Sequence, residues 1–382
     1  MICELESLRE QAQFRALEIS RGVNLCSNDY LGLSTDPRLK AALLEGVARA
    51  SSVGSTGSRL LSGNSREWED LESEFAGFAG TESALYFGSG YAANVGLLNS
   101  LLKPGDLVFS DALNHASLID GIRLSGARKI IYPHLDLQFL KAALQEHIGA
   151  PGAKLIVTES LFSMEGDVAP IDELLSLAKA HGAELVVDEA HATGVCGPQG
   201  RGITVERGCE GEALAIIHTC GKALASAGAF VCGGAALKDF LVNRARTFIF
   251  STAAPPYLAG QIQAAVELAR EAGAERAHLG KIAAALRDGL AARDLQCGSS
   301  VSHIVPIILG NNEKALHVAG CLQANGFAAK AIRPPTVPAG TARIRVSLTC
   351  KVTLEDVHRL VTVVGAAIQS APEIVSVSAV HA

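Results

Sequence analysis

Between residues 80 and 235 the chain alternates short apolar runs with helical patterns, and this alternation constrains the fold more than any other feature. The runs are rich in β-branched residues and nearly continuous, which is typical of strands buried on both faces of a sheet. Repeated strand–helix–strand units predict an α/β fold with a mainly parallel sheet flanked by helices. The predicted strands are Ser83–Phe87, Leu107–Ser110, Lys129–Tyr132, Leu155–Glu159, Glu184–Asp188, Ala215–Thr219 and Ala229–Cys232. One predicted helix, Ile171–Ala180, follows Pro170, and another begins near Gly90.

The pattern changes after Pro255-Pro256, where long helices and fewer strands predict a smaller α+β domain. Its predicted elements are one or two helices over Tyr257–Leu290, a strand His303–Leu309, a helix Glu313–Asn325, a strand Ala342–Leu348 and a helix Leu354–Gln369. We therefore predict an N-terminal segment (1–35), a large domain (36–255) and a small C-terminal domain (256–382). The last ten or so residues are expected to be a loose tail.

Composition excludes several classes of protein. The 33 basic and 39 acidic residues give a formal net charge of −6, without the basic face that nucleic-acid binding requires. No run approaches the ~18 apolar residues of a membrane span, and the charged N-terminus lacks a signal-peptide core, so we expect a cytoplasmic protein. The nine cysteines form no CxxC pair, so we predict neither a metal site nor a disulfide framework.

A lysine follows one of the predicted strands, and an aspartate is the last residue of another. Lys222 comes after Ala215–Thr219 among Gly and Ala residues, which leave room for a flat ring on a Schiff-base lysine. Asp188 ends a buried strand, where a carboxylate is costly without a charged partner such as a protonated pyridine nitrogen. Taken alone, Lys222 is better explained as a surface lysine and Asp188 as a helix N-cap. Because one strand–helix–strand step separates them, both are expected at the same sheet edge.

Three further groups are predicted at that edge. The backbone N–H groups of Gly90 and Tyr91, at a helix start, can bind a phosphate. The same turn could open a dinucleotide site, but GSGYAA lacks a third glycine. His115 can lie over a cofactor ring and His191 can reach the ring's phenolic oxygen, although each alone is more often a packing residue. The argument for a site depends on all these groups following strands of one sheet.

Several motifs together resemble the α-oxoamine synthases, which are fold-type-I enzymes that use pyridoxal phosphate (PLP) to condense an amino acid with an acyl thioester. The motifs are NDYLGL (Asn28–Leu33), GSTGSRLLSGN (Gly54–Asn64), FGSGYAAN (Phe87–Asn94), LNHASLIDG (Leu113–Gly121), ESLFSMEGDVAP (Glu159–Pro170), VVDEAHATGVCGPQGRG (Val186–Gly202) and TCGKA (Thr219–Ala223). Ala331–Thr349 and Phe248–Pro256 are similar to the branch of this family in biotin synthesis, which uses L-alanine and pimeloyl-CoA or a pimeloyl-carrier protein. The resemblance extends from about Cys26 to Gly365.

The resemblance implies a role for each site residue. Lys222 would carry the cofactor and act as a base, Asp188 would pair with the pyridine nitrogen, and His115 would stack on the ring. Further cofactor contacts are implied for Gly90, Tyr91, Ser163, His191 and Thr219, and substrate contacts for Asn28, His115, Arg333 and Thr336. Members of the family usually have a longer segment before NDYLGL, with an arginine that contacts substrate. Here 27 residues precede Asn28, and Arg15 is the best match, with Arg21 as a competitor.

Alternatives remain open at this stage. A sister activity, glycine C-acetyltransferase or 5-aminolevulinate synthase, would keep the same cofactor residues and use glycine with a short acyl-CoA. A nicotinamide-dependent dehydrogenase would share the parallel sheet, and a non-catalytic binding protein would most simply lack Lys222 or Asp188. The resemblance also implies a homodimer with its site between subunits, where Thr252 would reach the neighbour's phosphate site.

Overall fold

The computed structural model describes residues 2–50 and 52–371, and the chain forms two compact units. We call Asn28–Ser163 with Asp167–Arg276 the sheet unit, and Met1–Ser27 with Met164–Gly166 and Ala277–Ala382 the terminal unit. The division predicted at residues 35 and 255 stays a prediction. The predicted C-terminal tail lies outside the described residues. Every helix within the described residues is too short or too polar to cross a membrane.

A seven-stranded sheet forms the centre of the sheet unit. Its strands are β2 (Ser83–Phe87), β3 (Leu107–Asp111), β4 (Arg128–Tyr132), β5 (Lys154–Glu159), β6 (Glu184–Asp188), β7 (Ala215–Thr219) and β8 (Ala229–Gly233). The spatial order is β2-β8-β7-β6-β5-β3-β4. Among these seven strands, β8 runs opposite to the other six, which share one direction. The predicted α/β class with a mainly parallel sheet is therefore confirmed, and each predicted strand matches its observed bounds within one residue.

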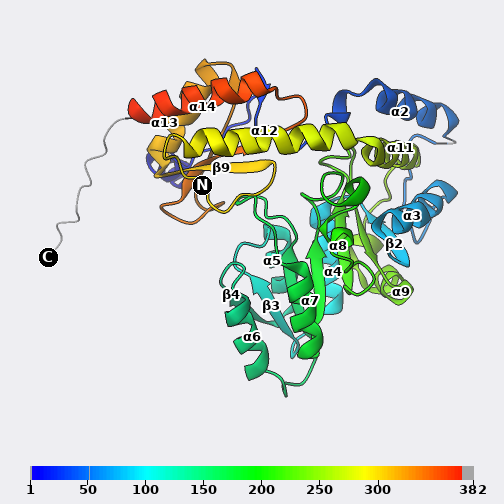
Figure 1. Cartoon of the computed structure of the whole chain (residues 1–382). Coiled ribbons are helices and arrows are strands. Elements are labelled where there is room, and N and C mark those ends of the chain that lie inside the picture. The colour runs from blue at the N-terminus through cyan, green and yellow to red at the C-terminus, as the bar shows by residue number, and fades with distance from the viewer. Residues whose placement is uncertain (1, 51, 372–382) are drawn as a thin grey trace. The chain divides into compact units, whose positions relative to one another are not determined.

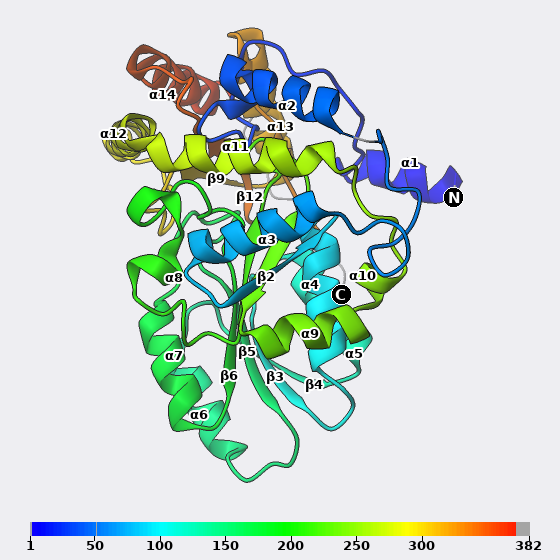
Figure 2. The same cartoon turned by 90° about the vertical axis from the view of Figure 1, so that its right-hand side faces the viewer.

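Helices cover both faces of this sheet (Figures 1 and 2). The helices of the sheet unit are α2 (Pro37–Arg49), α3 (Arg66–Ala79), α4 (Gly90–Leu101), α5 (Ala116–Ser125), α6 (Leu137–Glu146), α7 (Ile171–Ala180), α8 (Ile203–Glu206), α9 (Ala235–Arg244), α10 (Arg246–Ile249) and α11 (Tyr257–Glu271). On one face Leu97 of α4 and Leu118 of α5 join a cluster with strand residues such as Ile217. On the other, Phe75 of α3 stacks on Phe230 at a centroid distance of 3.9 Å. Alternate strand residues therefore pack against different helices.

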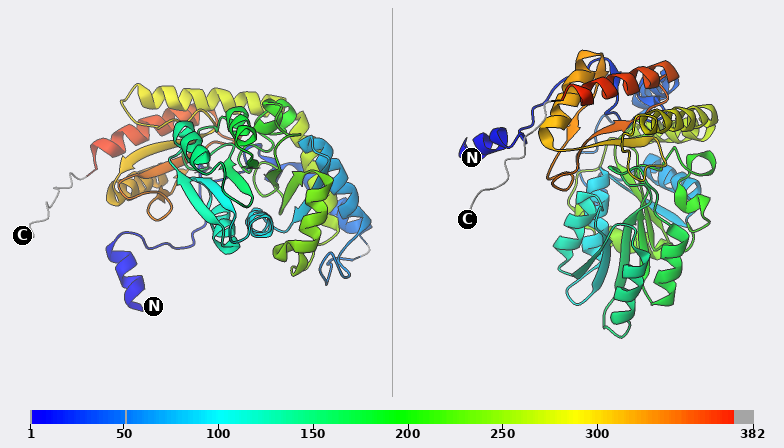
Figure 3. Two further views of the ribbon diagram at one scale, coloured as in Figure 1. Left: turned by 90° about the horizontal axis from the view of Figure 1, so that it is seen from below. Right: turned by 60° about the vertical axis from the view of Figure 1, so that its left-hand side comes forward.

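The terminal unit contains a three-stranded antiparallel sheet in the order β11-β12-β9. Its elements are α1 (Ile2–Glu10), β1 (Val23–Asn24), most of α12 (Gly273–Ala291), β9 (Ile304–Gly310), α13 (Asn312–Ala324), β10 (Phe327–Ala328), β11 (Ala331–Ile332), β12 (Ala342–Ser347) and α14 (Leu354–Gln369). Helices α13 and α14 lie side by side (Figure 3). The sequence did not predict β1, β10 and β11, because two-residue strands are too short to show a periodicity.

A buried carboxylate ties α3 to the sheet. Glu72 is 1% exposed and accepts hydrogen bonds from Arg59 Nη1 at 2.8 Å, Lys238 Nζ at 2.9 Å and the backbone N–H of Tyr86 at 3.0 Å. Two cations and a backbone donor together offset the cost of burying this charge.

Replacing Glu72 by Ala is expected to lower the free energy of unfolding by about 3–5 kcal/mol, because it leaves two cations at this position without their shared anion. The measurement is the urea unfolding curve of the purified variant. Asp70→Ala is the matched control, since Asp70 lies on the same helix in an exposed pair with Arg66 and should cost at most about 0.5 kcal/mol. Equal losses in the two variants would contradict this account.

Candidate active site

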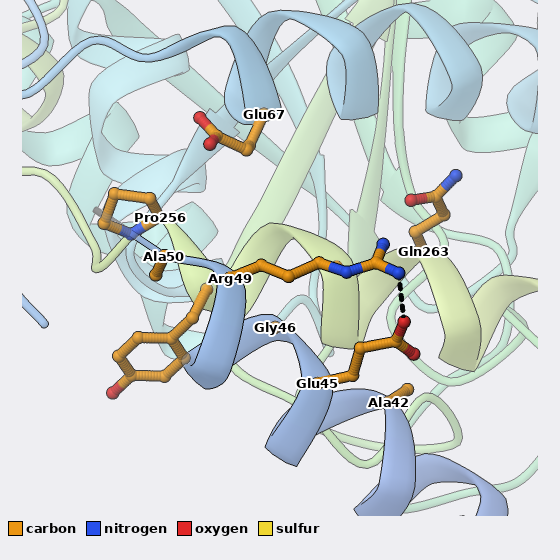
Figure 4. A pocket seen from close by; sticks show the side chains of 10 residues that line it. Ala42, Glu45, Gly46, Arg49, Ala50, Glu67, Pro256 and Gln263 are labelled. Carbon is orange, nitrogen blue, oxygen red and sulfur yellow. Dashed lines mark ion pairs between the residues drawn. The ribbon is translucent and has the colours of Figure 1, made fainter. Parts of the chain in front are cut away.

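The sheet unit contains three pockets of similar size. One of about 280 Å³, lined by residues of α3 and α11, contains none of the predicted site residues. The other two differ in their lining. One, of about 340 Å³, lies between α2 and α11, and its charged lining residues include the paired Glu45 and Arg49 (Figure 4). It contains none of the predicted site residues. The other, of about 300 Å³, contains most of them and is the candidate active site. Its lining residues are Asn28, Ser89, Gly90, Tyr91, Asn94, His115, Ser117, Glu159, Asp188, Ala190, His191, Thr219, Gly221, Lys222 and Gly228.

The topology of the sheet explains why these residues meet. Strands β2, β3, β5, β6 and β7 run in one direction, so their carboxyl ends lie at one edge. The last residues of β5 and β6, Glu159 and Asp188, are paired in register. The segments that follow β2, β3 and β7 contain Gly90, His115 and Lys222, respectively. The chain positions differ widely, but parallel strands bring them together.

Asp188 is a buried carboxylate that is held by neutral partners. It is 4% exposed, its Oδ2 accepts from Asn94 Nδ2 at 2.7 Å, and its Oδ1 accepts from the backbone N–H of Ala190 at 2.8 Å. Across residues 2–50 and 52–371 no Lys, Arg or His side chain forms an ion pair with it. Because a buried charge is costly without an opposite charge, this wall of the pocket fits the cationic part of a ligand.

A short chain of hydrogen bonds links Asp188 to His115. Asn94 Nδ2 also donates to Ser117 Oγ at 2.9 Å, and Ser117 Oγ lies 2.7 Å from His115 Nδ1. The backbone N–H of Ser117 donates to the same nitrogen, so Nδ1 carries a lone pair. Removal of water lowers the pKa of His115, with Asp188 opposing the shift and Lys222 adding to it. His115 is therefore neutral at pH 7, with its proton on Nε2.

Lys222 lies in a tight turn after β7. The backbone N–H of Ala225 donates to the Lys222 carbonyl at 2.9 Å, and that of Ser226 donates to Cys220 at 2.9 Å. Ala225 has a φ of 45°, a left-handed conformation that is uncommon for a residue with a Cβ. The turn directs Lys222 Nζ to within 2.9 Å of His191 Nε2. A half-buried amine thus lies beside an imidazole in the same pocket as Asp188.

The start of α4 provides anion-binding geometry. Ser89 is the N-cap, and its Oγ accepts from the backbone N–H of Ala92 at 3.1 Å. Free N–H groups and the positive end of the helix dipole lie in this first turn. A Cβ at Gly90 would come within 2.7 Å of Thr219 Cγ2, so only glycine permits this close approach. Tyr91 is half-exposed and its hydroxyl donates to Asp120.

Glu159 is a site residue that sequence reasoning missed. It is 2% exposed, and burial together with the neighbouring Asp188 raises its pKa to about 8, against the lowering effects of Lys222 and of nearby backbone N–H groups. The side chain is therefore largely protonated at neutral pH. The available signal was the one used for Asp188, since Glu159 also ends a buried apolar strand. Two other missed lining residues, Asn94 and Ser117, lie inside helices α4 and α5 and carried no such signal.

The remaining predicted residues lie outside this pocket, except Asn28, which lines it. In the terminal unit Arg15 Nη2 donates to Thr336 Oγ1 at 3.0 Å, and Arg333 donates to backbone carbonyls of Ala12 and Phe14. The structure therefore brings Arg15, Arg333 and Thr336 together. Arg21 and Thr252 are exposed, and Ser163 is half-buried in the loop after β5.

Comparison with known proteins identifies the family. The model for aminotransferase class I and II matches residues 20–364. The chain belongs to this family. An 8-amino-7-oxononanoate synthase from Burkholderia mallei (strain SAVP1) is 48% identical over 355 residues, covering 90% of this chain and 89% of the relative.

Solved structures of the family agree with this fold. A structure of SPT with a PLP internal aldimine has a TM-score of 0.88 and 29% identity over 97% of each chain. An 8-amino-7-oxononanoate synthase from Francisella tularensis has a TM-score of 0.80 and 29% identity, covering 91% of this chain and 98% of the other. These likenesses confirm the predicted fold-type-I architecture and the resemblance that the sequence motifs indicated.

The raised pKa of Glu159 gives a pH prediction. The folded protein keeps a proton that the unfolded chain releases above pH ~4.5, so this contribution to stability is complete below that pH and is lost as the pH rises to about 8. Glu159→Gln should therefore flatten the fall in the free energy of unfolding between pH 5 and 8. The measurement is a series of urea unfolding curves against pH.

Glu184→Gln is the control for this series, because Glu184 is exposed at the opposite end of the neighbouring strand. It should leave the pH profile of the wild type unchanged. A Glu159→Gln profile that matches the wild type would show that the Glu159 carboxyl is already ionised at pH 5.

Proposed function

We propose that this chain catalyses the PLP-dependent decarboxylative condensation of L-alanine with a pimeloyl thioester, giving 8-amino-7-oxononanoate, carbon dioxide and a free thiol. This is an acyl transfer of biotin synthesis. One observation carries the proposal: a single pocket is lined by an amine, a buried carboxylate and two imidazoles, in a chain 48% identical to 8-amino-7-oxononanoate synthases.

The pocket fits the cofactor on its own chemistry. Asp188 is a buried carboxylate that forms no salt bridge within residues 2–50 and 52–371, and Gly90 opens the first turn of α4 to a phosphate. Bound PLP supplies an electron sink that stabilises negative charge on the α-carbon of an amino acid. No metal is needed for this chemistry.

The chain's own residues then take distinct roles. Lys222 Nζ would hold the cofactor covalently, and as a free amine it would take the α-proton of alanine. Asp188 would face the pyridine nitrogen, and its negative charge would favour a proton there. His191 and Thr219 bind the cofactor's oxygens, and the N–H groups of Gly90 and Tyr91 bind its phosphate. His115, neutral and with its proton on Nε2, faces the ring and the substrate.

Substrate contacts are proposed for both units. Asn28 lines the pocket, whereas Arg15, Arg333 and Thr336 form a hydrogen-bonded group in the terminal unit. A guanidinium binds a carboxylate through two parallel hydrogen bonds, which suits Arg333 to an acidic substrate. We assign Arg15 rather than Arg21 to this group because Arg15 bonds Thr336. Ser163 is proposed as a further cofactor contact on the family pattern alone.

The sister activities are the second candidate. The solved structures with this fold include both SPT and an 8-amino-7-oxononanoate synthase at 29% identity, so fold likeness does not select the amino acid or the thioester. The curated relatives at 48% identity favour alanine and a pimeloyl donor. We further propose a cytoplasmic homodimer with its site between subunits, Thr252 reaching the partner, and an acyl donor carried on CoA or a carrier protein.

Lys222→Ala is expected to lower turnover by more than the roughly 10²–10⁴-fold that a general base alone contributes, because it removes both the attachment point of the cofactor and the base. Borohydride treatment with PLP should fix the cofactor to a Lys222 peptide in the wild type and not in the variant, as read by peptide mass. Lys179→Ala is the control, since Lys179 is exposed on α7 and pairs with Glu212. Near-normal turnover of the Lys222 variant would exclude this lysine as the nucleophile.

A panel of donors tests the substrate assignment. The enzyme with PLP should convert L-alanine and pimeloyl-CoA to 8-amino-7-oxononanoate, identified by product mass. Glycine in place of alanine removes one methyl group, worth about 1–3 kcal/mol, so we expect roughly 10–200-fold slower turnover. Faster turnover of glycine with acetyl-CoA or succinyl-CoA would assign a sister activity instead.

A further inference from the structure

A chain of hydrogen bonds leads from Lys222 into the protein interior. His191 Nε2 is 2.9 Å from Lys222 Nζ, and His191 Nδ1 is 2.6 Å from the hydroxyl oxygen of Tyr30. The Tyr30 hydroxyl donates to Asn28 Oδ1 at 3.1 Å. Tyr30 is 0% exposed and does not line the pocket. It therefore touches the site only through other residues.

The two ends of this chain fix the position of every proton in it. A lysine ammonium can only donate and an amide carbonyl oxygen can only accept. His191 Nε2 must then carry a lone pair for Lys222, and Nδ1 of the neutral ring must carry the proton. The hydroxyl oxygen of Tyr30 then accepts a hydrogen bond from His191 Nδ1–H, and the Tyr30 O–H donates to Asn28 Oδ1. This arrangement satisfies all three bonds together.

We propose that Tyr30 is a positioning residue for the reaction: its buried hydroxyl holds His191 in the tautomer protonated on Nδ1, so that Nε2 presents a lone pair to Lys222. The role of Lys222 in this statement rests on the proposed function, whereas the tautomer of His191 is a property of the chain by itself. A fixed acceptor beside Nζ stabilises the ammonium and orients the imidazole for the cofactor's oxygen.

The local backbone explains why Tyr30 can act in this way. Its N–H donates to the carbonyl of Asn28 at 2.8 Å, which closes a turn that brings both side chains towards His191. The rings of Tyr30 and His191 are 6.1 Å apart and tilted by 49°, so they meet edge to edge through their polar atoms. Phenylalanine would keep the ring and its packing and remove only the hydroxyl.

Other titratable groups face Lys222 from the elements around it, and Tyr30→Phe leaves all of them in place. They are Tyr91 from α4, His115 after β3, Glu159 at the end of β5, and Asp188 and His191 at and after the end of β6. A change in the behaviour of Lys222 in this variant is therefore traced to the lost hydroxyl.

The first test uses the wild-type protein without cofactor. Two-bond ¹H–¹⁵N spectra of histidine-labelled protein, with His191 assigned through His191→Gln, report which ring nitrogen carries the proton. We expect the Nδ1-protonated form between pH 7 and 8. Protonation on Nε2 would overturn the proposal without any Tyr30 variant.

The second test compares Tyr30→Phe with Tyr132→Phe. Tyr132 is equally buried, but its hydroxyl lies near Thr158 and Asp111. The measurement is the pH midpoint for capture of PLP by Lys222, with the product fixed by borohydride. In Tyr30→Phe, Lys222 should lose the lone pair of His191 Nε2 as its hydrogen-bond acceptor, which should lower this midpoint by about one pH unit. The spectra of this variant should also show less of the Nδ1-protonated form. The control should change neither.

An unchanged midpoint and tautomer in Tyr30→Phe, or equal changes in the two variants, would overturn the positioning role. Failure of the wild type to capture PLP on Lys222 would count against the proposed function, and the spectra would still decide the tautomer. The two proposals can therefore fail separately.

Discussion

The site depends on one buried carboxylate. Asp188 lies at the end of a central strand, 4% exposed, and its protein partners are an amide and a backbone N–H. Such a group costs free energy in a protein that contains no ligand, and the cost is recovered when a cation binds beside it. The amide of Asn94 and the backbone N–H of Ala190 are neutral, so the Asp188 carboxylate is left available for a cationic group of a ligand.

Two hydrogen-bonded chains extend from the pocket and fix its protons. One runs from Asp188 through Asn94 and Ser117 to His115, and places a lone pair on His115 Nδ1. The other runs from Lys222 through His191 to Tyr30. With His191 held by Tyr30 as we propose, the two imidazoles adopt opposite tautomers, although both come from loops after strands. Burial and the neighbouring Asp188 raise the pKa of Glu159 to about 8, so this carboxyl is largely protonated at neutral pH.

Strand positions were predictable because buried parallel strands are nearly continuous apolar runs, and residues that follow them must reach one edge. This reasoning placed Lys222, Asp188 and His191 in one pocket. It did not find Tyr30 or Asn94, whose roles depend on contacts with residues far away in the chain. The family pattern named Arg15, Arg333 and Thr336, and only the folded terminal unit showed their mutual hydrogen bonds.

The sequence by itself determined the α/β class, the order of strands and helices, and the residue types at strand ends, because periodicity and composition are local properties. Tertiary structure decided which polar atoms meet, which nitrogen of His115 carries a proton, and that the Glu159 carboxyl retains its proton at neutral pH. These depend on distances of about 3 Å and on burial between segments that are remote in sequence, and no local pattern encodes them.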